Sequence, residues 1–438
     1  MPEGEAARRT VELAARQSYG KLLAVLAART RDVAAAEDAL ADAFAAALAT
    51  WPAQGVPRSP AAWLLKVAGR RAIDAARRVR TRDGAQTALL LLEDELRAPG
   101  GEAADIPDER LRLMFVCAHP AIEPAARAPL ILQTVLGFDA GTIASAFLAA
   151  PVAMAQRLVR AKRKIRDAGV PFREPAAEEM PERLQVVLEA IYAAFAEGWS
   201  DPLGSQRERG ALAAEAIWLG RLVCSLLPVE PEALGLLALM LHAEARRPAR
   251  RSPAGEYVPL ADQDPRCWDA ALIAEAEAVL RQASVIGRPG RFQLEAAVQS
   301  AHAARRLSGR TDWAAIVAMY DALAAMTGSV VVAINRAVAL GELLGPSAGL
   351  RELDVLDADP RLADYQPYWA ARAELLARSG EAVPAALAYD RAIGLADDAA
   401  VRRFLQQRQA AVLAPGAQRG GTQNQRGIRK DHQARGRA

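Results

Sequence analysis

The sequence has few cysteines, few aromatic residues and no long apolar run. Its 438 residues include three cysteines, Cys117, Cys224 and Cys267, an odd number without the spacing of a disulfide framework. This usage is typical of a reducing compartment, so we expect a cytoplasmic protein. The run of four leucines at 89–92 is far too short to cross a bilayer, and the N-terminus does not resemble a signal peptide. We therefore expect no membrane segment.

Motifs that carry common catalytic chemistry are also missing. The sequence contains no phosphate-binding loop of the GxxxxGK type and no HExxH motif. Cys117 and His119 form a Cys-Ala-His triplet, but a structural zinc site needs four ligands and no second pair follows. We expect Cys117 in the core, and His242 and His302 as structural histidines within helices. The sequence thus favours a protein that is not an enzyme and needs no metal or cofactor.

Alanine and leucine dominate the composition, whereas aromatic residues make up only 5%. Such an excess of helix-forming residues predicts an all-α fold. A chain of 438 residues is too long for one hydrophobic core, so we expect two to three domains. Because the net charge is only +3, any surface that binds nucleic acid must be local.

Residues 127–167 predict a helix-turn-helix that ends in a strongly basic helix. A first helix starts near Arg127 and breaks at 137–139, a short apolar helix follows, and Pro151 opens a third helix at its first position. The third helix has one apolar face, formed at intervals of 4, 3 and 4 by Met154, Leu158, Ala161 and Ile165. The rest carries side chains able to contact bases and phosphates, namely Gln156, Arg157, Arg160, Lys162, Arg163, Lys164 and Arg166. The alternative is an ordinary amphipathic helix with a solvated basic face.

The first 82 residues predict a second basic helical unit. The segment 36–48 has an apolar stripe, with three acids outside it; the stripe is Leu40, Phe44 and Leu48, and the acids are Glu37, Asp38 and Asp42. A loop with three prolines, 52–60, leads into a helix from Pro60 to about Arg82. Between Pro57 and Arg82 the only acid is Asp74, and the basic residues are Arg58, Lys66, Arg70, Arg71, Arg77, Arg78, Arg80 and Arg82. Trp63 lies on the apolar stripe of this helix, so we expect it in the core.

Charge and composition mark the domain boundaries. The stretch 83–105 holds six acids and one base, which predicts an acidic linker at 83–106 between helical domains at 1–82 and 107–172. A linker rich in proline and glutamate at 173–181 precedes a helical domain at 182–413. The last residues, 414–438, are rich in glycine, glutamine and arginine and predict a disordered tail.

Small residues recur in the C-terminal domain with a period near 34. The first recurring position is occupied by Ala303, Ala337 and Ala373. Twelve residues after each of these lie Ala315, Gly349 and Ala385. Four residues further lie Met319, Leu353 and Tyr389, and three residues after those lie Ala322, Leu356 and Ala392. The pattern resembles tetratricopeptide repeats, stacked helical pairs whose concave face binds partners. Coincidence in an alanine-rich chain is the alternative.

Three motifs in the chain, in this order, resemble the extracytoplasmic-function type of bacterial RNA polymerase sigma factors. AlaGluAspAlaLeuAlaAspAlaPhe (36–44) is similar to the helix with which the family binds the polymerase clamp. Residues 63–78, from TrpLeuLeuLys to AlaAlaArgArg, resemble its promoter-melting helix, and residues 157–166 its −35 recognition helix. The part from 182 onward resembles the subgroup with a tetratricopeptide-like extension. The chain departs from the family's usual residues at Ala41, Arg70 and Thr142, which commonly are Gln, Asn and Glu.

The resemblance implies core RNA polymerase and promoter DNA, at the −35 and −10 elements, as partners. Asp38 and Asp42 would contact polymerase. The DNA-binding residues would be Arg58, Lys66, Arg70, Arg71, Arg77, Arg78, Gln156, Arg157, Arg160, Lys162 and Lys164. The loop 52–59 would hold a base pulled out of the duplex, and the acidic linker would thread the RNA channel.

We therefore expect a sigma factor that directs polymerase to promoters, helps to melt them and is regulated in cis by its C-terminal helical-repeat domain. The partner of that domain would be a protein, a peptide or a small molecule. One alternative is a helix-turn-helix regulator that binds duplex operator DNA without polymerase. Another is a repeat-type scaffold whose basic helices are incidental.

Overall fold

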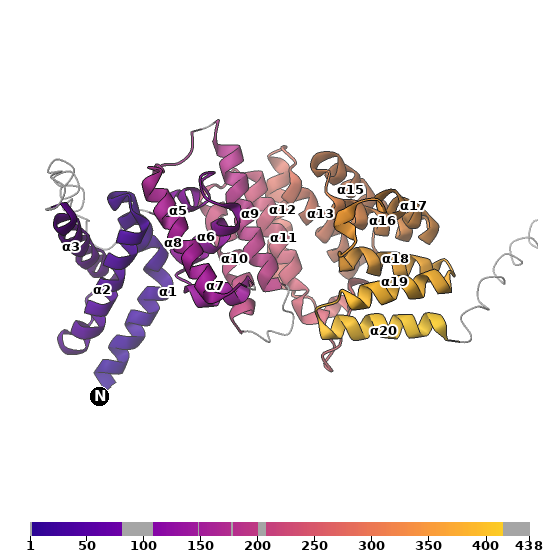
Figure 1. The fold of residues 1–438 in the computed structure, drawn as a ribbon, viewed down its shortest axis with the longest axis horizontal. Coiled ribbons are helices and arrows are strands. Elements are labelled where there is room, and N and C mark those ends of the chain that lie inside the picture. Colours follow the sequence, from indigo (N-terminus) through magenta and orange to yellow (C-terminus); the bar gives the residue numbers. More distant parts are fainter. Residues whose placement is uncertain (1, 81–107, 148, 177, 200–206, 415–438) are drawn as a thin grey trace, which may run out of the picture. The chain divides into compact units, whose positions relative to one another are not determined.

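The computed structural model describes residues 2–80, 108–147, 149–176, 178–199 and 207–414 (Figure 1). In these residues every regular element is a helix, apart from one isolated bridge between Arg251 and Tyr257, so the predicted all-α fold is confirmed. The chain divides into two compact units, 1–228 and 229–438. The linker expected at 83–106 lies outside the described residues, as does the tail expected at 414–438 beyond Ala414. No helix of the described part is long and apolar enough to span a membrane.

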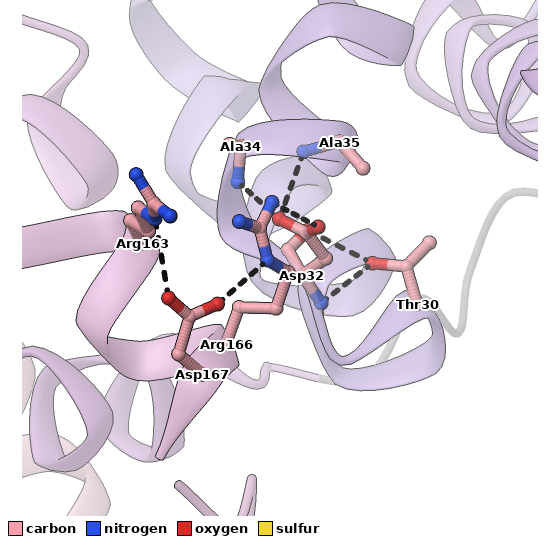
Figure 2. Close-up of polar contacts among 7 residues, drawn as sticks. All are labelled: Thr30, Asp32, Ala34, Ala35, Arg163, Arg166 and Asp167. Carbon is pink, nitrogen blue, oxygen red and sulfur yellow. Dashed lines mark hydrogen bonds and ion pairs between the residues drawn. The ribbon is translucent and has the colours of Figure 1, made fainter. Parts of the chain in front are cut away.

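The first unit begins with three packed helices, α1 (Pro2–Thr30), α2 (Val33–Gln54) and α3 (Pro60–Arg80). Asp32 caps α2, because its Oδ1 accepts hydrogen bonds from the backbone N–H groups of Ala34 and Ala35, at 3.0 and 3.1 Å (Figure 2). The buried side of α2 is formed by Val33, Ala36, Ala39, Leu40, Ala43, Ala47 and Trp51. Leu48, expected on the apolar stripe, is 47% exposed, since alanines rather than large residues line the contact.

The predicted domain at 107–172 contains α5 (Arg110–Cys117), α6 (Pro124–Leu136), α7 (Ala140–Ala146) and α8 (Pro151–Asp167). The last three are the helices of the predicted helix-turn-helix segment. Gly137 ends α6 with a φ of 76°, a left-handed conformation that favours glycine. Pro151 stands at the start of α8, as predicted. The apolar stripe of α8 is confirmed, because Met154, Leu158, Ala161 and Ile165 are its buried residues.

Two further helices, α9 (Met180–Trp199) and α10 (Arg207–Leu226), belong to the first unit, although they fall within the C-terminal domain predicted from the sequence at 182–413. Helix α9 packs on α5 and α6, and α10 packs on α7. Arg183 donates a hydrogen bond of 2.6 Å to the carbonyl oxygen of Phe115. The guanidinium of Arg110 lies 5.0 Å from the ring centroid of Trp218. These contacts attach the start of the C-terminal extension to α5–α7.

The second unit is a succession of helices (Figure 1). A longer segment, 246–269, connects the first two α-helices of this unit. The elements of the unit are α11 (Pro231–Ala245), η1 (Arg247–Arg250), η2 (Leu260–Asp262), η3 (Pro265–Cys267), α12 (Ala270–Val285), α13 (Arg291–Ala303), α14 (Arg305–Ser308), α15 (Trp313–Thr327), α16 (Val330–Leu344), α17 (Pro346–Leu356), η4 (Pro360–Leu362), α18 (Gln366–Arg378), α19 (Ala382–Gly394) and α20 (Ala399–Leu413). From α15 onward, consecutive helices pack against each other.

The proposed repeat positions are buried in the later helices. Ala337 and Ala373 are fully buried, and Gly349 lets α17 approach α16 closely, because a Cβ atom there would overlap the carbonyl oxygen of Ala337. In α15, by contrast, the buried residues are Ile316 and Leu323, one position after the expected Ala315 and Ala322. The regular spacing therefore describes α16–α19 better than α15, and the tetratricopeptide assignment stays a prediction.

Candidate polymerase and nucleic-acid interface

Helix α3 separates an apolar side from a basic side. Leu64, Ala68 and Ala72 are buried against the neighbouring helices. Trp63 is half-buried and makes an edge contact with Trp51, at 5.4 Å between ring centroids, which fits the predicted core role. The predicted DNA-binding side chains of this region are exposed: Arg58, Lys66, Arg70, Arg71 and Arg77; the side chain of Arg78 lies outside the described residues. This face presents cations to solvent and is suited to a phosphate backbone.

Two carboxylates of α2 are free to meet a partner from solvent. Asp38 and Asp42 are both exposed and lie one helical turn apart, on the side opposite the buried Leu40 and Ala43. The predicted contact of these carboxylates with polymerase stays a prediction.

Helix α8 presents most of its predicted DNA-binding side chains to solvent. Gln156, Arg160 and Lys164 are exposed, and Arg157 is partly buried. Lys162 is placed differently, since its side chain is only 11% exposed. Its ammonium group donates a hydrogen bond to Glu37 of α2, which forms an ion pair between two distant segments of the chain.

Glu37 received no role in the sequence analysis, yet it joins α2 to α8. Its side chain is 16% exposed, and its Oε1 has no hydrogen-bond partner in the described part of the chain. Burial raises the pKa of Glu37, and the opposite charge of Lys162 acts against that rise. A half-buried carboxylate of this kind depends on its cation, because removing one member of a buried pair leaves the other charge without compensation.

A second ion pair lies at the end of α8 (Figure 2). Arg166 reaches Asp32 at 3.6 Å, the same carboxylate that caps α2. Asp167 accepts hydrogen bonds of 3.2 Å from Arg163 and from Arg166, which orients both guanidinium groups. The C-terminal half of α8 is thus held at the N-terminal end of α2.

A third contact joins α1 to α6. A Cβ atom at Gly20 would overlap the carbonyl oxygen of Val135, so only glycine permits this approach. The ring of Tyr19 packs over Gly137, and burial raises the pKa of its hydroxyl. We call the three contacts, Gly20–Val135, Glu37–Lys162 and Asp32–Arg166, the closed contact. It holds α1–α3 against α5–α8 within the first unit.

The described residues include no cluster of three or more histidine, cysteine or acidic side chains that could hold a metal. Cys117 is fully buried, and its sulfur lies 3.4 Å from the hydroxyl oxygen of Thr134. Burial raises the pKa of this thiol to about 12, so the thiol stays protonated. The predicted core role of Cys117 is confirmed.

Comparison with known proteins defines the class. Residues 15–82, which contain α2, α3 and most of α1, match the family model of sigma-70 region 2. This match supports the assignment of the chain as a sigma factor. Sigma factors are transcription initiation factors that bind RNA polymerase and promoter DNA, and they are not enzymes. Residues 183–284 match a family of unknown function, DUF6596. No solved structure matches the chain.

The chain is 40% identical over 395 residues to an uncharacterized protein of Rhizobium meliloti (strain 1021). The match covers 89% of this chain and 92% of the relative. This chain belongs to the same family as that protein.

Proposed function

We propose that the chain is a sigma factor of the extracytoplasmic-function type, which acts in the cytoplasm, directs RNA polymerase to promoters and assists promoter melting. The observation that carries the proposal is the match of residues 15–82 to sigma-70 region 2, together with the exposed basic face of α3 inside that match. Lys66, Arg70 and Arg71 would hold the phosphates of the opened strand. Arg58, Arg77 and Arg78 would extend this surface along the strand.

Polymerase would bind α2 through Asp38 and Asp42. Both carboxylates are exposed, and neither is engaged by the closed contact, so they stay available in this arrangement. Solvated ion pairs are weak one at a time, and we expect the pair to act together.

The −35 element would be read by α8. Gln156, Arg157 and Arg160 lie in its first three turns, where major-groove readers contact bases. Lys162 and Lys164 would contact phosphates. Lys162 can do so only after it leaves Glu37, and Arg166 is likewise engaged by Asp32. The closed contact would therefore have to break before α8 docks on a promoter.

The C-terminal extension, expected at 182–413, would regulate this opening in cis. Its first helices, α9 and α10, pack on α5–α7, which gives the extension a direct physical route to α8. A partner of the tetratricopeptide-like part, whether a protein, a peptide or a small molecule, would shift the balance between closed and open forms.

Promoter occupancy in cells tests the proposal. Chromatin immunoprecipitation of the full-length protein should recover start-site-proximal DNA with two short motifs at the −35 and −10 spacing. Recovery of symmetric operator sequences without polymerase would instead support the duplex-binding regulator.

A further inference from the structure

Helix α8 carries two valines on its solvent side. Val152 is 70% exposed and Val159 is 62% exposed, more than any other large apolar side chain among the described residues of the first unit. The two positions are seven residues apart, which is two helical turns, so both side chains project to the same side of the helix. That side lies opposite the buried stripe that runs from Met154 to Ile165.

Neither packing nor helix stability accounts for these valines. Helix α8 packs on α2, α6 and α7, and both valines stay exposed in this arrangement. Valine is a weaker helix former than alanine, so alanine at either position would stabilise an exposed helix face better. A single exposed valine needs no explanation, but two on one face form an apolar patch that is available to a partner.

The surroundings of the patch are polar and cationic. Gln156 is exposed between the two valines, four residues after the first and three before the second. Arg160 and Arg163 are exposed one turn further, four residues after Gln156 and Val159. The only acid of α8 is its last residue, Asp167, which accepts a hydrogen bond of 3.2 Å from Arg163 (Figure 2). The partner should therefore combine apolar groups with negative charge.

The major groove of a DNA duplex has this complementary chemistry. Its rims are phosphates, and its floor presents the edges of the bases together with the apolar C5-methyl group of thymine. The groove is wide enough for an α-helix, whose apolar side chains contact thymine methyl groups and whose glutamine side chains pair with adenine. A duplex would thus match the valines, the amide and the cations of α8 at the same time.

We propose that Val152 and Val159 specify thymine in the −35 element by packing against C5-methyl groups in the major groove, while Gln156 binds adenine. The inference rests on the proposed function, because it requires that α8 enters the groove. Seven residues of helix span about 10 Å, and successive base pairs are about 3.4 Å apart, so the two methyl groups would lie about three base pairs apart. The valines would therefore add two specified positions to those that polar side chains read.

Replacement of thymine by deoxyuridine tests the contact, because deoxyuridine keeps the base pair and lacks only the methyl group. The probe is a labelled promoter duplex recovered from cells with the full-length protein, and each thymine of its −35 element is replaced singly. Fluorescence anisotropy measures binding of the full-length protein, with and without core polymerase. We expect one or two positions at which the replacement weakens binding about fourfold, the effect of one buried methyl group.

Two variants assign each methyl group to a side chain. Val152→Ala and Val159→Ala should each weaken binding of the thymine duplex by at least about fourfold, and each should abolish the deoxyuridine effect at one position only. Both variants should fold, because alanine is the better helix former at an exposed site. Val229→Ala, at a valine of the second unit with 72% exposure, is the matched control and should change neither the affinity nor the deoxyuridine effect.

The outcomes separate this inference from the proposed function. Polymerase-dependent binding that is equal for thymine and deoxyuridine at every position would overturn the valine contact and leave the sigma-factor proposal in place. Valine variants that lose the same affinity for both duplexes would also overturn it. Binding without polymerase that keeps the deoxyuridine effect would support the valine contact and contradict the sigma-factor proposal. No binding of the duplex in either condition would overturn both.

Discussion

Lys162 of α8 donates a hydrogen bond to Glu37 of α2, which lies 125 residues earlier in the chain. Both side chains are largely withdrawn from solvent, with 11% and 16% exposure. In the proposed function, the same lysine would contact a phosphate of the −35 element. A carboxylate of its own chain and promoter DNA would then compete for one residue.

Weakening this pair should favour the open form. Glu37→Gln keeps the shape of the side chain but removes the charge, at a cost to the closed contact of about 1–2 kcal/mol. We expect promoter affinity to rise by about fivefold to thirtyfold, the factor that corresponds to this free energy. Fluorescence anisotropy with a promoter duplex measures it, and Glu189→Gln, an exposed acid of α9, is the control. Equal affinities for both variants would show that the closed contact does not limit DNA binding.

The recognition helix gives a prediction about specificity. Arg157→Ala should weaken promoter binding by about 1–3 kcal/mol, the usual range for a lost base contact. Arg163→Ala removes an exposed cation of the same helix and should cost less, without a change in −35 preference. Footprinting at a cognate promoter measures both. An unchanged affinity and an unchanged −35 preference in Arg157→Ala would refute the role of α8.

The acidic pair on α2 predicts polymerase binding. Asp38→Lys combined with Asp42→Lys should abolish co-purification with core polymerase, because both reversals place like charge against a basic partner. The folded state should persist, since both side chains are exposed. Glu178→Lys combined with Glu182→Lys provides a control of equal charge change. Retained polymerase binding with a normal circular dichroism spectrum would contradict the assignment.

The packing of α9 and α10 on α5–α7 predicts what truncation does. A chain of residues 1–175 loses both helices and uncovers apolar side chains such as Phe115 and Val116, so we expect it to lose most activity. A chain of residues 1–228 keeps the whole first unit and should stay folded, with transcription activity that differs strongly from that of the full-length protein. Neither change should alter promoter preference. Equal activity of all three forms would make the extension a separate module with its own task.

Two histidines of the second unit predict a pH dependence of stability. Burial lowers the pKa of His242 and of His302 from 6.5 to about 4. Between these values the unfolded chain binds more protons than the folded chain, so stability rises with pH from about 4 to 6.5 and falls on acidification. Each histidine contributes at most about 1.4 kcal/mol per pH unit. Thermal unfolding of His302→Gln over this range should show a shallower slope than the native protein; an identical slope would exclude the contribution.

The helices of the first unit could be predicted because their signals are local. Pro151 and the stripe from Met154 to Ile165 define α8 through its start and its buried face. The stripe on α2 was partly wrong, because Leu48 is exposed while alanines make the contact. A prediction from periodicity places large apolar residues in the contact. It therefore misses a helix face of small residues, although such a face permits close packing.

The closed contact could not be predicted from the sequence. Glu37 and Lys162 look like ordinary solvated charges, and only the fold brings them together. Gly20 gives no local signal either, because its role depends on Val135 of another helix. Polar contacts between remote segments depend on tertiary structure, whereas helix boundaries depend on neighbouring residues.

Run-off transcription with purified core polymerase tests the central claim most directly. The full-length protein, added to core polymerase and a template that carries a promoter recovered from cells, should yield a transcript of defined start and length. Substituting the −35 element of the template, or adding the protein with Asp38 and Asp42 both changed to Lys, should remove that transcript. A protein that binds the template but yields no promoter-specific transcript with core polymerase would contradict the account.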